Sequence, residues 1–131
     1  RVQYETGCDP ETMEILVPSF MLQPLVENAV KHGISARSKG GRIVVRTWKQ
    51  GQRLWISVAD TGEGIDEDKL EKIKRALKEG DGSGVGIGLG NIARRLKAMY
   101  EDGEVRIESR KGCATVVQLA FTPENCKEDE P

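Results

Sequence analysis

Residues 42–64 read RIVVRTWKQGQRLWISVADTGEG and decide the fold of this chain. Apolar and polar side chains alternate over 42–48 and again over 53–59, and four residues that include a glycine separate the two runs. This pattern predicts an antiparallel hairpin. The second predicted strand ends in Asp60-Thr-Gly-Glu-Gly64, where the alternate glycines allow a tight turn that can approach a ligand closely.

Helices and strands are interleaved around this hairpin. Apolar residues at helical spacing predict helices, and alternation with a period of two predicts strands. We therefore expect a two-layer α/β sandwich with a mixed, mostly antiparallel sheet and the helices on one face. The predicted elements are an edge strand (1–6), a helix (22–33), the hairpin (42–48 and 53–59), a helix capped by Asp66 (66–79), a helix (89–100) and a second hairpin (104–109 and 115–121).

Length and composition limit the possible functions. The 131 residues suit one domain, which we place at 1–123, followed by an acidic tail at 124–131 that we expect to be disordered. Lys and Arg number 20 against 21 Asp and Glu, which excludes a generic electrostatic nucleic-acid binder. No run of 18 apolar residues exists, so we expect no membrane span, and we also expect no direct membrane contact by this domain.

The cysteines give an expectation about the redox compartment. Cys8, Cys113 and Cys126 are odd in number and widely spaced, which favours a reduced, cytoplasmic chain. We expect Cys113 to be a small buried apolar residue and not a nucleophile.

The predicted helix over 22–33 carries polar side chains off its apolar stripe. Asn28 and His32 stand one turn apart, as do Glu27 and Lys31. An amide oxygen can ligate Mg²⁺, and cationic side chains suit phosphates. A solvated face with a Glu27–Lys31 ion pair explains the same residues, so the helix alone does not decide between the two interpretations.

Asp60 has two interpretations of the same kind. A carboxylate at the end of a strand can accept a hydrogen from an exocyclic amine such as that of adenine, with Gly62 and Gly64 shaping the approach. Asp and Gly are also the ordinary residues of a turn that leaves a strand.

A third motif, GSGVGIGLG at 82–90, leads directly into a predicted helix. Alternate glycines and a helix N-terminus suit an anion such as phosphate. The motif matches neither the dinucleotide-binding fingerprint nor a P-loop. Its Val, Ile and Leu residues are poor linker composition, which favours a lid over phosphates. Arg94 and Arg95, on the helix that follows, face either phosphate or solvent.

Taken together, these motifs resemble the ATP-binding catalytic domain of bacterial sensor histidine kinases, in the GHKL superfamily with gyrase-type and mismatch-repair ATPases. LQPLVENAVKHG (22–33) resembles the N box of that family, and DTGEG (60–64) and GVGIGLGN (84–91) resemble its two glycine boxes. The first motif is most similar to the autolysin-sensor subgroup. The resemblance covers residues 1–121 and implies the Bergerat-type fold of this superfamily.

The resemblance implies a Mg²⁺-ATP site and a role for each matching residue. Asn28 would hold Mg²⁺ and Glu27 would orient the reacting group, while Lys31 and His32 would contact phosphate. Asp60 would accept the adenine amine in a pocket shaped by Gly62 and Gly64, and Thr115 would support Asp60 through a water. The glycines of the lid would be Gly84, Gly86 and Gly88, with Leu89 beside them in the site.

Three departures from the family pattern bear on the activity. Pro24 stands where the ATPase branch has a glutamate that activates water, which favours transfer to a protein side chain. Ala114 replaces the glycine that usually precedes the threonine at 115. The single histidine, His32, lies inside the nucleotide motif.

We therefore expect a protein-histidine kinase domain that does not autophosphorylate alone. The resemblance places the acceptor histidine on a separate dimerisation domain and adds a downstream response regulator as partner. It implies a cytoplasmic domain of a membrane-bound sensor. The alternative is an anti-sigma-factor-type serine kinase, or a regulatory nucleotide-binding module, of the same fold.

Overall fold

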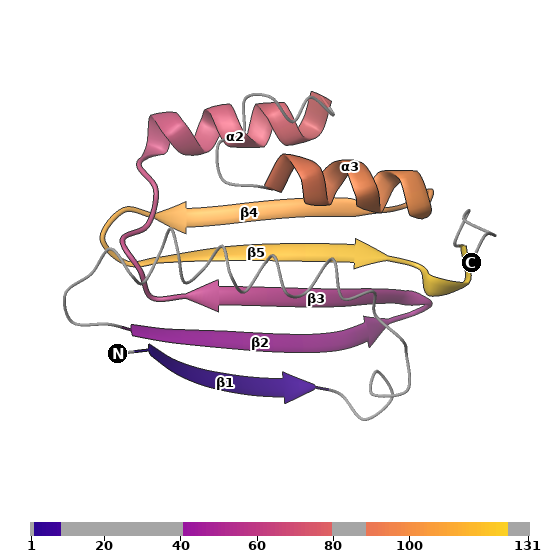
Figure 1. Ribbon diagram of the computed structural model, residues 1–131, viewed down its shortest axis with the longest axis horizontal. Helices are drawn as coiled ribbons and strands as arrows, with labels where there is room; N and C mark the ends of the chain where they lie inside the picture. The colour runs from indigo at the N-terminus through magenta and orange to yellow at the C-terminus, as the bar shows by residue number, and fades with distance from the viewer. Residues whose placement is uncertain (1, 9–40, 80–88, 126–131) are drawn as a thin grey trace.

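The computed structural model describes residues 2–8, 41–79 and 89–125 (Figure 1). Within these ranges the strands are β1 (Val2–Cys8), β2 (Gly41–Gln50), β3 (Arg53–Asp60), β4 (Glu104–Arg110) and β5 (Ala114–Phe121). The helices are α2 (Glu67–Glu79), α3 (Leu89–Met99) and a short 3₁₀ helix, η5 (Pro123–Asn125).

The strands form one sheet in the order β1-β2-β3-β5-β4. β1 pairs with β2 in parallel, and the other neighbours are antiparallel. Both predicted hairpins are confirmed. Their turns use Gly51 (φ 66°) and Gly112 (φ 82°) in the left-handed region, which glycine adopts without steric cost.

The two described α-helices, α2 and α3, follow their sequence signals closely. Asp66 caps α2, because its Oδ1 accepts a hydrogen bond from the Lys69 N–H at 2.9 Å. The predicted stripe of Leu70, Ile73 and Leu77 is buried. α3 ends at Met99, one residue earlier than predicted.

The core lies between these helices and one face of the sheet, which confirms the predicted two-layer arrangement. Figure 1 shows α2 and α3 on the β4 side of the sheet. Alternate strand residues join both helices in one apolar cluster, whereas Trp55 and Ala120 are buried on the opposite face. There Trp48 stacks on Trp55 with ring centroids 6.0 Å apart. The cluster includes Ile43, Leu54, Ile56, Val58, Leu70, Ile73, Leu77, Leu89, Ile92, Leu96, Ile107, Val117, Leu119 and Phe121.

Two expectations need correction. The first strand spans Val2–Cys8 and not 1–6, because its pairing with β2 continues to Cys8↔Thr47. Cys113 is exposed and not buried, because it lies in the turn that joins β4 to β5. Of the predicted tail, residues 124 and 125 belong to η5, and residues 126–131 lie outside the described ranges. None of the described helices has the length and apolar character needed to cross a membrane.

Candidate functional site

Asp60, the last residue of β3, is the one charged residue buried among those the structure describes. Its relative exposure is 5%. Its Oδ1 accepts a hydrogen bond from the Gly62 N–H at 2.8 Å. Burial raises the pKa of Asp60 above its ordinary value of 3.8, and this bond offsets only part of the effect. In the described part of the chain no cation forms an ion pair with Asp60, so the Gly62 hydrogen bond alone offsets the cost of burying its charge there, and only in part.

The turn after Asp60 is held from both sides. On the β2 side, the Thr61 N–H donates to the Arg42 carbonyl at 3.1 Å, and the Arg42 N–H donates to Thr61 Oγ1 at 2.9 Å. On the other side, the Gly112 N–H donates to the Glu63 carbonyl at 2.6 Å. Figure 1 shows the chain leaving β3 and passing the β4–β5 turn before it enters α2. These bonds fix the backbone around the buried carboxylate.

Gly64 is required by this arrangement. Its φ is +77°, and a Cβ built there would lie 2.0 Å from the Arg110 carbonyl oxygen. Any side chain at this position would therefore push the turn away from the β4–β5 hairpin. The alternate glycines predicted to shape a ligand site thus include one that allows two backbone segments to come into contact.

Thr115 lies directly opposite Asp60 in the sheet, and Ser109 lies opposite Thr115. The three side chains point to the helix-covered face, since they continue the alternation of Val58, Val117 and Ile107, which are buried in the core. Thr115 Oγ1 and Ser109 Oγ are 2.7 Å apart. The sheet thus presents a row of three oxygen-bearing side chains at the end of its apolar face.

This row can bind a polar edge of a flat ligand. Within the described residues, the second carboxylate oxygen of Asp60 accepts no hydrogen bond, and Asp60 is paired with Thr115 on the neighbouring strand. A ligand that brings N–H donors would supply what the buried carboxylate lacks. The register places Thr115 opposite Asp60, and its support of Asp60 through a water stays a prediction.

Sequence reasoning missed Ser109 and Ile65. The Ile65 N–H donates to Ser109 Oγ at 2.8 Å, which ties the glycine turn to β4. The period-two alternation places Ser109 on the same face as the core residue Ile107, so this signal was present in the sequence. Its pairing with Thr115 depends on the hairpin register, which the alternation alone does not fix.

The other predicted site residues divide into two groups. Leu89 is the first residue of α3, and its side chain is fully buried in the core, so any ligand contact would come from its backbone. Arg94 is exposed and donates to Asn91 Oδ1 at 2.5 Å. The remaining residues lie outside the described ranges: Glu27, Asn28, Lys31, His32, Gly84, Gly86 and Gly88.

A Mg²⁺ site is not visible in the described ranges. They contain no group of three His, Cys, Asp or Glu side chains that could hold a metal ion. The magnesium prediction therefore rests on Asn28 and the sequence motif.

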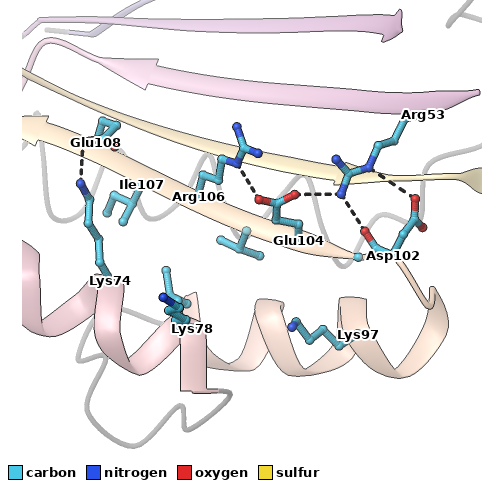
Figure 2. A pocket seen from close by; sticks show the side chains of 12 residues that line it. Arg53, Lys74, Lys78, Lys97, Asp102, Glu104, Arg106, Ile107 and Glu108 are labelled. Carbon is cyan, nitrogen blue, oxygen red and sulfur yellow. Dashed lines mark hydrogen bonds and ion pairs between the residues drawn. The ribbon is translucent and has the colours of Figure 1, made fainter. Parts of the chain in front are cut away.

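A groove of about 640 Å³ lies elsewhere, between β4 and the two helices (Figure 2). Leu77, Val105 and Ile107 are among its apolar lining residues, and Lys78 and Lys97 are at its helical side. It contains none of the predicted site residues. The groove is therefore separate from the Asp60 site.

Comparison with known proteins agrees with the fold and with the predicted motifs. Residues 17–125 match the family of histidine kinase-, DNA gyrase B-, and HSP90-like ATPases. The chain belongs to this family. It is an ATPase-type domain of the kind found in sensor histidine kinases.

The relatives found within this family are bacterial sensor proteins. The chain is 34% identical over 122 residues to the sensor protein LytS of Oceanobacillus iheyensis, covering 91% of this chain and 20% of the relative. It is 37% identical over 93 residues to the sensor histidine kinase YpdA of Escherichia coli K12, covering 71% of this chain and 16% of the relative. The chain thus spans about a fifth of these relatives.

Among solved structures, the histidine kinase domain of the blue-light activated kinase EL346 of Erythrobacter litoralis aligns with a TM-score of 0.64 and 20% identity. The alignment covers 94% of this chain and 52% of that one. It agrees with the two-layer fold that the sequence predicts.

Proposed function

We propose that this domain binds Mg²⁺-ATP, with the adenine amine donating to Asp60. The observation that carries this proposal is the buried Asp60 carboxylate, which has no cation partner among the described residues and borders a turn that requires glycine at 64. A hydrogen bond from an amine would compensate a charge that burial now disfavours.

The phosphate half of the site would be formed by the sequence motifs. Lys31, His32 and the glycines Gly84, Gly86 and Gly88 would contact the phosphates, and Asn28 would hold Mg²⁺. When bound, Mg²⁺ would supply positive charge that stabilises the phosphates during transfer. Glu27 would orient the reacting group.

The phosphoryl acceptor would be a histidine outside this domain. Pro24 occupies the position of the water-activating glutamate and cannot do acid–base chemistry, which supports transfer to a side chain over hydrolysis. The relative YpdA of Escherichia coli K12 is a sensor histidine kinase, which favours histidine over serine as the acceptor. The phosphoryl group would then pass to a response regulator. The domain would be a cytoplasmic part of a membrane-bound sensor.

Calorimetry of this chain with ATP tests the proposal. We expect saturable ATP binding that strengthens when Mg²⁺ is present, and negligible ATP turnover. Titration with ribose 5-triphosphate, which lacks the base and keeps the sugar and the triphosphate, is the matched control and should show no comparable binding. A flat ATP titration with and without Mg²⁺ would overturn the nucleotide assignment.

A further inference from the structure

Ser109 joins three segments that meet at the proposed base site. Its hydroxyl oxygen accepts the Ile65 N–H at 2.8 Å, donates to the Ala114 carbonyl at 2.9 Å, and lies 2.7 Å from Thr115 Oγ1. The hydroxyl therefore connects the glycine turn, β4 and β5. It lies one strand away from Thr115 and two strands away from Asp60 in the same row.

Counting protons assigns a direction to the bond between the two hydroxyls. A serine hydroxyl has one proton and two lone pairs. The Ala114 carbonyl can only accept, so the Ser109 proton goes to it, and the Ile65 N–H occupies one lone pair. The second lone pair then accepts the proton of Thr115. The Thr115 oxygen can then only accept hydrogen bonds on the side that faces Asp60 and a bound ligand.

We propose that Ser109 is a positioning residue that fixes Thr115 as a hydrogen-bond acceptor beside Asp60, and so selects a purine with an amine at C6 over one with an oxo group. The inference rests on the proposed function and extends it to base specificity. Two neighbouring acceptors, directly or through one water, suit an amine. A C6 oxo group would meet the same two oxygens without a donor, which leaves it unsatisfied.

Removal of the Ser109 hydroxyl would free the Thr115 proton. In Ser109→Ala, Thr115 could donate to an oxo group, and the Ile65 N–H would lose its acceptor. We expect ATP to bind a few-fold more weakly and the preference for ATP over inosine triphosphate to fall by about threefold or more, since the lost bond is a neutral one. A merely structural loss would weaken both nucleotides equally and leave their ratio unchanged.

The experiment measures affinities for ATP and inosine triphosphate in the parent, Ser109→Ala, Ser109→Thr, Thr115→Val and the double variant Ser109→Ala/Thr115→Val. We expect Ser109→Thr to keep the preference for ATP over inosine triphosphate, because it keeps a hydroxyl at this position. In the Thr115→Val background, Ser109→Ala should change the preference no further.

Two results would overturn the inference: an unchanged preference in Ser109→Ala, or an equal change in the Thr115→Val background. Failure of the parent to bind ATP would instead refute the proposed function, so the two failures are distinguishable. Thermal unfolding of each variant shows whether it is folded. If Ser109→Ala does not fold, Ser109→Cys gives the same test: its thiol can still donate weakly to the Ala114 carbonyl but accepts the Thr115 proton only weakly, so the preference for ATP should again fall.

Discussion

The two ends of the sheet hold carboxylates in opposite environments. At the end where β3 finishes, Asp60 is buried with one backbone hydrogen bond and no cation partner in the described part of the chain, and burial raises its pKa. At the end where β3 begins, Arg53 Nη2 donates to Glu104 at 2.8 Å, and its Nε lies 3.4 Å from Asp102. Figure 2 shows this second set beside the groove.

The pKa values at the Arg53 end shift in the opposite direction. Burial alone would raise the pKa of Asp102, but hydrogen bonds from Thr122 and the charge of Arg53 outweigh it and lower the pKa. Glu104 behaves likewise, because Arg106 and Arg53 both donate to it. The paired carboxylates link β3 to the start of β4, whereas the carboxylate without a cation partner in the described residues is the one that we propose to bind a ligand.

Glycine substitutions at the two ends should give the largest difference in stability. Gly64→Ala places a methyl group against the Arg110 carbonyl, whereas Gly51→Ala, at a similar positive φ, meets nothing within 4 Å. We expect the free energy of unfolding to fall by about 1 kcal/mol in Gly51→Ala, and by about 3 kcal/mol in Gly64→Ala because the clash adds to the backbone cost. Urea denaturation measures both. Equal losses would contradict the described contact.

Replacing Arg53 tests the paired end. Arg53→Met removes the bonds to Glu104 and to the Asp102 carbonyl, and the side chain is 28% exposed, so we expect a loss of about 1–2 kcal/mol. Arg53→Lys keeps the positive charge without the several N–H donors of the guanidinium, and it should lower the free energy of unfolding less than Arg53→Met does. Neither variant should change ATP affinity, because Arg53 lies at the far end of the sheet. Weaker ATP binding in Arg53→Met would contradict the claim that the Arg53 end of the sheet takes no part in ATP binding.

Acid should act on the paired end in a defined direction. Carboxylates whose pKa is lowered by folding stabilise the protein above their ordinary values of 3.8 and 4.5, and this contribution is lost as the pH falls through the lowered values. We expect parent stability to fall between about pH 5 and about pH 3, and to fall less in Arg53→Met. Parallel losses in both proteins would show that Arg53 does not lower these pKa values.

The more exposed ion pair between α2 and β4 should matter least. Lys74 Nζ lies 2.9 Å from Glu108 Oε1, with side-chain exposures of 37% and 74%. Lys74→Met should therefore change the free energy of unfolding by no more than about 0.5 kcal/mol. If Lys74→Met lowered the free energy of unfolding as much as Arg53→Met does, the stronger solvent exposure of the Lys74–Glu108 pair would not explain a smaller contribution to stability.

Local patterns predicted the strands and helices of the described ranges, because alternation, capping and glycine turns act within a few residues. They did not predict the exposure of Cys113 or the full length of β1, since both depend on how segments meet in three dimensions. For the site, the family resemblance linked Thr115 to Asp60 through a water; the register places the two residues opposite each other, and the water-mediated role stays a prediction. Ser109 was missed because its role depends on the register between β4 and β5.

The central claim is that Asp60 reads the base, and ATP titration of Asp60→Asn against Asp102→Asn tests it most directly. We expect Asp60→Asn to bind ATP at least about tenfold more weakly, as for a lost bond to a charged group. Its thermal midpoint should not fall, since burial raises the pKa of Asp60 and an amide oxygen can still accept the Gly62 N–H. Asp102→Asn should lower the midpoint and leave affinity unchanged. An Asp60→Asn variant that binds ATP as tightly as the parent would contradict the account.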